Sequence, residues 1–293
     1  RLKINYFINK NLKKNLKVIE INNSGFPSKM IDNFDKILLL NLKFNEIIKK
    51  IKIKIFQKIF SSFKFNPDFF LYAGYKKKKN LKDVKSIKFN TWDYSNILHY
   101  KKKTKLKKYF IFVDGAGPKD VSDREFLDRK HYLTSDVWYK DLKIFLFHLK
   151  KIYNLDLIVL NHPFSSKKKI QKHYKGIKNF SNKTQELIKN SKFIVTRQST
   201  AISYALYYKK PILLIYSNQN KNDYYDINIS LKLSKLLKIN SVNINDLNKK
   251  FIIDKCMKIN LNIYKKYISS YLTERKDKLS NSDILNSIVI NND

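Results

Sequence analysis

The chain has 293 residues, of which 43% are hydrophobic and 14% aromatic; this suffices to bury the core of one large domain or two ordinary ones and excludes a disordered protein. No run of 18 apolar residues and no signal-peptide pattern is present, so we expect no membrane-spanning segment. The single cysteine, Cys256, excludes an internal disulfide and a cysteine-based metal site, and it fits a reducing compartment.

The formal net charge of +37 suggests a nucleic-acid partner at first sight. All but five of the 61 basic residues are lysine, however, and the lysines are spread over the whole chain. Arginine, not lysine, makes the bidentate contacts that specify phosphates and bases. We therefore interpret the charge as a solvated lysine coat and predict no nucleic-acid partner. Its expected consequence is loose attraction to anionic lipid headgroups, about 1 kcal/mol for each lysine near a membrane surface.

Strand and helix signals alternate along the first hundred residues. Short apolar runs predict strands at 17–21, 68–73 and 86–89. Segment 33–63 has apolar residues at roughly helical spacing and predicts one or two helices. Asn90–His99 indicates a turn and a short helix, with Asp93 as the N-cap. The charged segment 101–108 is the expected linker to a second domain.

After this linker, strands and helices alternate regularly, which favours an α/β fold with a parallel, doubly wound sheet. The predicted strands are 109–113, 155–160, 193–196 and 212–216. The predicted helices are 137–153, 181–190 and 201–208. Two or three further helices are expected after Asn245, with Tyr264, Tyr267 and Tyr271 spaced to pack on one face.

Three predicted strands end in polar motifs: Asp114-Gly115, His162-Pro163, and the run from Arg197 to Thr200. Parallel strands expose their carboxyl ends at one edge of a sheet, and ligands of open α/β sheets bind there. We therefore expect the three motifs to line one crevice. This convergence carries more weight than any single motif.

Each residue of the first two motifs has a possible chemical use. Asp114 could act as a general base, and Gly115 would let the backbone approach a ligand closely. His162 could donate a hydrogen bond to a phosphate or carboxylate, with Pro163 fixing its turn. The alternatives are that Asp114 is a helix cap and that His162 has a structural role.

The third motif and a charged loop complete the candidate site. Arg197, Ser199 and Thr200 could hold the phosphate of a nucleotide, and the alternative for the Ser-Thr pair is an N-cap without a ligand. Segment 119–136 is rich in charge, including Asp123 and Arg124, and indicates a substrate loop or, alternatively, a solvated loop. It has no EF-hand pattern and no set of His and Cys ligands, so we predict no metal ion.

The order Asp-Gly, His-Pro, Ser-Thr resembles bacterial GT-B glycosyltransferases of surface polysaccharide synthesis, including sialyltransferases and Kdo transferases, and also CDP-glycerol glycerophosphotransferases. The closest likeness is to polysaccharide-biosynthesis proteins with a D-Y-x-x-x-L segment, here Asp93–Leu98. Their S-T-A-x-S-x-A helix, followed by K-P-I, corresponds to Ser199–Ala205 and Lys210–Ile212. The resemblance covers about residues 90–216.

The resemblance implies two Rossmann-like lobes with parallel sheets. It implies Asp114 as the catalytic base, His162 on the phosphate of the donor, and Ser199 and Thr200 on that phosphate or on a sugar carboxylate. Sialyltransferases have a second acid before Asp-Gly, where this chain has Val113. Their acidic motif also lies far from His-Pro in the amino-terminal domain. Here Asp114 begins the carboxyl-terminal lobe instead, so it could shape the donor site rather than act as base.

We expect an amino-terminal, acceptor-side lobe at 1–107 that is short for a complete GT-B lobe, a nucleotide-sugar-binding lobe at 108–240 and carboxyl-terminal helices at 241–293. The predicted function is metal-independent, cofactor-free transfer of a sugar from a nucleotide-sugar donor, with a CMP-linked donor as one option. The expected acceptor is a glycan or lipid-linked glycan, such as a lipopolysaccharide or capsule chain. The expected location is the cytoplasm, with peripheral contact at the inner membrane.

Three alternatives remain open at this point. The first is a glycerophosphotransferase with a CDP-linked donor. The second is a basic nucleic-acid-binding protein without enzymatic activity, which predicts a contiguous basic face with exposed aromatics. The third is an inactive sugar-binding lobe of a larger assembly.

Overall fold

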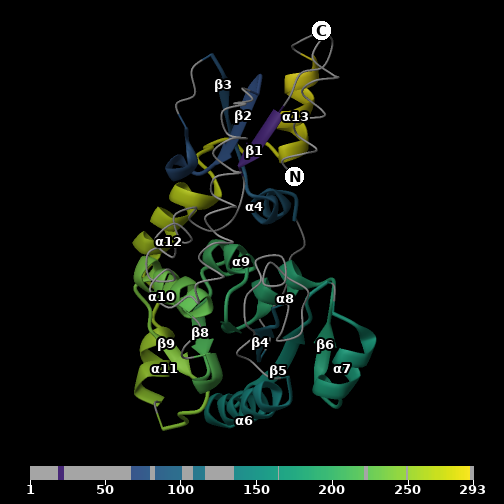
Figure 1. The fold of residues 1–293 in the computed structure, drawn as a ribbon, viewed down its shortest axis with the longest axis vertical. Coiled ribbons are helices and arrows are strands. Elements are labelled where there is room, and N and C mark those ends of the chain that lie inside the picture. Colours follow the sequence, from purple (N-terminus) through teal and green to yellow (C-terminus); the bar gives the residue numbers. More distant parts are fainter. Residues whose placement is uncertain are drawn as a thin grey trace, which may run out of the picture. The chain divides into compact units, whose positions relative to one another are not determined.

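The computed structural model describes residues 19–22, 67–79, 83–100, 108–115, 135–163, 165–220, 224–248 and 250–290 (Figure 1). The chain forms two compact units, one of Arg1–Thr91 with Ser270–Asp293 and one of Trp92–Ser269. The first unit ends about 16 residues before the boundary expected at residue 107, and the carboxyl-terminal segment divides between the two units at Ser270.

The first unit contains a parallel three-stranded sheet in the order β1-β2-β3. Its strands are β1 (Ile19–Asn22), β2 (Phe69–Ala73) and β3 (Lys85–Phe89), and a short 3-10 helix, η2 (Tyr75–Lys77), follows β2. Every residue of β2 is buried, as expected for a central apolar strand. Helix α13 (Asn281–Ile290) packs on the sheet through Ile284 and Ile288, which lie one turn apart.

Buried amides fasten this carboxyl-terminal segment to the end of β3. The Asn90 backbone N–H donates to Asn281 Oδ1 over 3.1 Å, and Asn281 Nδ2 donates back to the Asn90 carbonyl over 3.1 Å. The Thr273 hydroxyl donates to Asn90 Oδ1 over 2.6 Å, and Asn90 Nδ2 donates to the Leu279 carbonyl over 3.0 Å. Because Asn90, Thr273 and Asn281 are all buried, each bond satisfies a polar group that has lost water.

The second unit contains a parallel six-stranded sheet in the order β6-β5-β4-β7-β8-β9. Its strands are β4 (Tyr109–Val113), β5 (Asp156–Leu160), β6 (Lys178–Phe180), β7 (Ile194–Thr196), β8 (Ile212–Tyr216) and β9 (Ser241–Asn243). The α-helices of this unit are α4 (Trp92–Leu98), α6 (Ser135–Tyr153), α7 (Lys167–Tyr174), α8 (Thr184–Asn190), α9 (Ile202–Tyr207), α10 (Tyr224–Leu237), α11 (Lys250–Cys256) and α12 (Leu261–Tyr267). A 3-10 helix, η3 (Asn218–Asn220), follows β8, and a π-helical turn, Ile268–Leu272, follows α12.

The core of the second unit lies between the sheet and α6. Trp138, Leu142, Phe145 and Leu149 recur at helical spacing and pack against alternate residues of the strands, such as Phe110 and Phe112 of β4. Helix α11 covers the same face through Ile253 and Cys256. The predicted fold class, α/β with parallel sheets in two Rossmann-like lobes, is confirmed.

The predicted strands and helices that fall on described residues are present, with ends that shift by a few residues. The burial of Tyr264, Tyr267 and Tyr271 is confirmed. Asp93 lies within the first turn of α4 rather than at its N-cap. The sequence pattern does not predict α7, β6, α10 or β9. The helices expected at 33–63 and most of the expected linker, 101–107, lie outside the described residues.

None of the helices in the described part of the chain has the length and apolar character needed to cross a bilayer.

Candidate active site

The three polar motifs end three neighbouring strands. Strand β4 pairs with β5 on one side and with β7 on the other, all in parallel. Asp114 therefore follows the middle strand, His162 follows one neighbour and Arg197 follows the other. The Asp114 backbone N–H donates to the Leu160 carbonyl over 2.9 Å, and the Thr196 hydroxyl donates to the Val113 carbonyl over 3.3 Å. The topology thus brings the motifs to adjacent positions at one edge of the sheet.

The backbone at Gly115 runs beside the turn that follows β7. A Cβ atom added at Gly115 would lie 3.7 Å from the Gln198 carbonyl oxygen, which is an ordinary van der Waals distance. The two segments are therefore neighbours, but this approach does not by itself require glycine at this position.

Asp114 is buried at the end of the central strand. Its side chain is 4% exposed, and its charge acts on the Tyr174 side chain at the end of α7. Burial and then the charge of Asp114 raise the pKa of Tyr174 well above its usual value, so that this tyrosine stays protonated at neutral pH. The burial of Asp114 favours a role inside the wall of the site over direct contact with an incoming hydroxyl.

An aromatic cluster surrounds that pair. The Tyr139 ring stacks on His173 with 3.9 Å between ring centroids, and it meets Tyr174 edge-on at 5.7 Å. The Arg197 guanidinium lies 5.3 Å from the centroid of the Trp138 ring, so the helix α6 that forms the core also orients this cation at the end of β7. Sequence reasoning missed Tyr139, His173 and Tyr174. The adjacent Trp-Tyr and His-Tyr pairs in otherwise lysine-rich helices were the available signal.

His162 and Pro163 are more accessible than Asp114. His162 is partly exposed and Pro163 exposed, and the His162 carbonyl accepts from the Ser165 N–H over 2.8 Å, which closes the turn after β5. The preceding Asn161 is buried and donates through Nδ2 to Asn179 Oδ1 over 3.1 Å, which ties the ends of β5 and β6 together. A rigid turn therefore presents the imidazole at the sheet edge.

Ser199 and Thr200 make different local contacts. Ser199 Oγ accepts from the Ala201 N–H over 3.2 Å in a local turn ahead of α9. The N-cap residue of α9 is Ala201, without a side-chain capping bond, so the alternative of an N-cap formed by the Ser-Thr pair is wrong. The bond uses a lone pair of Ser199 and leaves its hydroxyl hydrogen for another acceptor. Thr200 is exposed, and it lowers the pKa of the nearby Asp93 carboxyl on α4.

Asp93 connects two motifs of the sequence analysis, the segment Asp93–Leu98 and the helix within Ser199–Ala205. Its Oδ1 accepts from the Tyr204 hydroxyl of α9 over 3.2 Å. Tyr94 and Tyr207 meet edge-on beside this contact, at 5.8 Å between ring centroids. Burial raises the pKa of Asp93, and the neighbouring hydroxyls of Thr200 and Tyr204 oppose that rise. The interpretation of Asp93 as a simple cap missed these contacts across the two helices.

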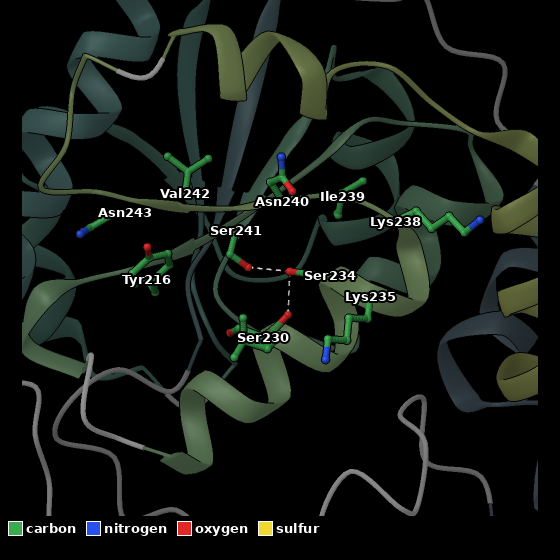
Figure 2. Close-up of a pocket in the computed structure, with 11 residues that line it drawn as sticks. Tyr216, Ser230, Ser234, Lys235, Lys238, Ile239, Asn240, Ser241, Val242 and Asn243 are labelled. Atoms are coloured by element: carbon green, nitrogen blue, oxygen red, sulfur yellow. Dashed lines mark hydrogen bonds between the residues drawn. The ribbon is translucent and has the colours of Figure 1, made fainter.

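A hollow of about 770 Å³ lies elsewhere in this unit, between α10 and the edge strand β9. Figure 2 shows its serine wall, in which the Ser234 hydroxyl donates to the Ser230 carbonyl over 2.8 Å and lies 2.6 Å from Ser241 Oγ. None of the predicted site residues lines this hollow. The serine hydroxyls drawn in it already bond to one another or to the backbone.

The remaining site predictions cannot be placed. Asp123 and Arg124 lie outside the described residues. Within the part of the chain that the structure describes, no three His, Cys, Asp or Glu side chains gather as metal ligands would.

The sequence matches no protein-family model, and comparison with curated proteins finds no significant relative. Among solved structures, a UDP-GlcNAc 2-epimerase of Methanocaldococcus jannaschii, in complex with UDP-GlcNAc and UDP, is 14% identical over 72% of this chain and 56% of its own, with a TM-score of 0.36. The glycotransferase of kitacinnamycin is 8% identical over 93% and 69%, with a TM-score of 0.47. KpsC of Thermosulfurimonas dismutans, a beta Kdo 2,7 transferase, is 10% identical over 95% and 100%, with a TM-score of 0.30. The chain spans less than two thirds of the epimerase, and at such TM-scores these likenesses assign it to no family.

Proposed function

We propose that the chain is a GT-B glycosyltransferase that moves a sugar from a nucleotide-activated donor to a glycan or lipid-linked glycan, without a metal ion. The observation that supports this proposal is the strand order β5-β4-β7, in which the segments with His162, Asp114 and Arg197 follow three consecutive strands at the carboxyl edge of a parallel sheet. Ligands of open α/β sheets bind at this edge. The three motifs also occur in the order that resembles surface-polysaccharide glycosyltransferases.

In the proposed reaction, an acceptor hydroxyl attacks the anomeric carbon of the donor sugar. A carbon–oxygen bond to the acceptor forms, the bond to the donor phosphate breaks, the nucleotide leaves as an anion, and a base takes the hydroxyl proton. His162, Arg197 and Ser199 each carry a hydrogen that can be donated to the leaving phosphate. Donors held in place before the reaction stabilise charge as it develops, and this is the role that a metal ion has in other enzymes.

We propose that Asp114 positions the donor side of this site through Tyr174. Its burial and the influence of its charge on the tyrosine support this role better than that of the catalytic base. Asp114→Asn keeps the shape of the side chain and removes its charge. We expect donor affinity and transfer to fall together, by about tenfold, since the tyrosine loses the charge that acts on it.

The two roles of Asp114 give different kinetics. A positioning role predicts that Tyr174→Phe reproduces the effect and that the double variant adds little, because both changes act through one contact. Steady-state rates and donor binding by calorimetry measure this. Loss of transfer with normal donor affinity and an altered pH profile would show instead that Asp114 is the base.

A thermal-shift panel tests the proposed function as a whole. A nucleotide or nucleotide-sugar that binds only the native state stabilises it by about 2.7 kcal/mol at a hundred times its dissociation constant. We expect CMP-, UDP- or CDP-linked sugars to raise the melting temperature, and the nucleotide released on incubation with acceptor to identify the donor. Release of CMP from CDP-glycerol would indicate a glycerophosphotransferase. A panel without any stabilising nucleotide would contradict the proposal.

A further inference from the structure

Exposed apolar side chains gather on the outer side of α6. Val137, Ile144 and Phe147 are 46%, 50% and 49% exposed. They face away from the sheet, since Ile144 lies about 200° round the helix from the core residue Leu142. No other helix, strand or loop in the described part of the chain carries more than one exposed large apolar side chain. Scattered apolar side chains are normal on a protein surface, so this group on one helix needs an explanation.

Two lysines belong to the same side of the helix. Positions 137, 140, 144, 147 and 151 are separated by three or four residues, which places them on one line along a helix surface. Lys140 and Lys151 are exposed, and neither has an ion-pair partner among the described residues. We call this group the α6 stripe: Val137, Lys140, Ile144, Phe147 and Lys151.

The charge along the α6 stripe is positive. A further lysine, Lys143, is half-buried beside it. The two carboxylates of α6 already have partners, because Asp136 forms an ion pair with Lys172 over 2.8 Å and Asp141 accepts from Asn245 Nδ2 over 2.7 Å. The α6 stripe thus combines exposed apolar side chains with positive charge that no neighbouring carboxylate balances.

This combination favours an anionic lipid surface over a second copy of the chain. In a twofold contact between copies, the same positive stripe would face itself, and three apolar side chains fall well short of the about 20–30 residues a side of a stable protein interface. At a membrane surface, apolar side chains enter the boundary between headgroups and acyl chains, and lysines reach the anionic headgroups through their flexible stems.

We propose that the α6 stripe docks the second unit onto an anionic membrane surface. Ile144 and Phe147 enter the headgroup region, and Lys140 and Lys151 bind anionic headgroups. The lysine coat attracts such a surface from any side of the protein, whereas the α6 stripe gives the contact one orientation. The inference goes beyond the proposed function, because docking requires neither donor nor acceptor.

Sedimentation of the full chain with lipid vesicles tests the docking. We expect binding to vesicles of phosphatidylcholine and phosphatidylglycerol in equal parts, and much weaker binding to phosphatidylcholine alone. The double variant Ile144→Ser, Phe147→Ser should weaken binding to the anionic vesicles by about tenfold or more, because it removes the apolar insertion. The double variant Lys140→Gln, Lys151→Gln should weaken it by about thirtyfold.

Two control variants remove equivalent groups elsewhere in the second unit. Leu231 and Leu261 are 47% and 44% exposed, so Leu231→Ser with Leu261→Ser matches the apolar change and should leave vesicle binding as in the wild type. Lys175 and Lys178 are exposed beside the end of α7, so Lys175→Gln with Lys178→Gln removes the same charge and should cost much less binding than the lysine pair of the α6 stripe. Melting temperatures check that every variant is folded.

An environment-sensitive dye reports which surface touches the lipid. The only natural cysteine, Cys256, is buried, so the variant Ile144→Cys can be labelled at the new thiol. We expect the dye emission to shift to shorter wavelength on anionic vesicles. The same dye attached in Leu231→Cys should not respond.

Several results would overturn the inference. Absence of vesicle binding, equal losses in stripe and control variants, or an unchanged dye at position 144 would show that the stripe makes no oriented contact. Equal binding to neutral vesicles would contradict the role of its lysines. A dimer that Ile144→Ser with Phe147→Ser abolishes would assign the stripe to a second copy. Because nucleotide is absent from these measurements, their failure leaves the proposed function intact, and a thermal-shift panel without any stabilising nucleotide leaves the docking intact.

Discussion

Replacing His162 by alanine is expected to lower donor turnover by about 10²–10³-fold, the usual cost of removing one preorganised donor from a developing anion. His162 is partly exposed at the end of β5, next to the end of the central strand β4. We expect the imidazole to reach a leaving phosphate from this position, and alanine has no hydrogen to donate in its place. The measurement is the rate of nucleotide release in the presence of acceptor.

His99→Ala is the matched control for this prediction. His99 is exposed after the end of α4 and belongs to none of the three motifs, so its removal should change neither rate nor stability. Circular dichroism and the melting temperature check that His162→Ala leaves the fold intact, as expected for a side chain outside the core. Equal turnover in His162→Ala and His99→Ala would remove His162 from the site.

Replacing Gly74 by alanine is expected to destabilise the first unit by about 2–5 kcal/mol, the combined cost of an unfavourable backbone conformation and of overpacking. Gly74 follows the central strand β2 with φ at 78°, a region that side chains rarely adopt. A Cβ atom here would lie 2.4 Å from the Ser270 carbonyl carbon and the Tyr271 nitrogen. Both are backbone atoms, so the clash cannot be relieved by rotating a side chain.

Gly176 provides an internal control with almost the same φ, 79°, after the end of α7. A Cβ atom there meets nothing within 4 Å, so Gly176→Ala should cost only the backbone term, about 1 kcal/mol. Urea denaturation of both variants gives the two free energies of unfolding. Equal losses in the two variants would mean that the close approach of Ser270 and Tyr271 to Gly74 contributes nothing to stability.

The strands of the second unit were predictable because they are buried on both faces and bounded by charged or turn residues. Tyr109–Val113 and Ile212–Tyr216 are continuous apolar runs of the length that parallel strands require. Strands β6 and β9 have three residues each and contain polar side chains. They are stabilised by pairing with β5 and β8 at the sheet edges. The local sequence pattern cannot predict such pairing, because the partner strands are distant in the sequence.

The sequence predicts those residues of the candidate site that directly follow a strand. Asp114, His162 and Arg197 follow neighbouring strands, so a parallel sheet alone brings them together. Contacts between helices could not be predicted, because they depend on how the helices pack. The stacking of Tyr139 on His173 and the bond from Tyr204 to Asp93 are of this kind.

A crystal structure with a bound nucleotide-sugar tests the central claim, that the carboxyl ends of β5, β4 and β7 form one anion-binding site. We expect the phosphate bonded to the sugar to lie within hydrogen-bond distance of the His162 ring and of Ser199 Oγ. A nucleotide bound in the hollow between α10 and β9, or one whose phosphates contact neither His162 nor Ser199, would contradict it.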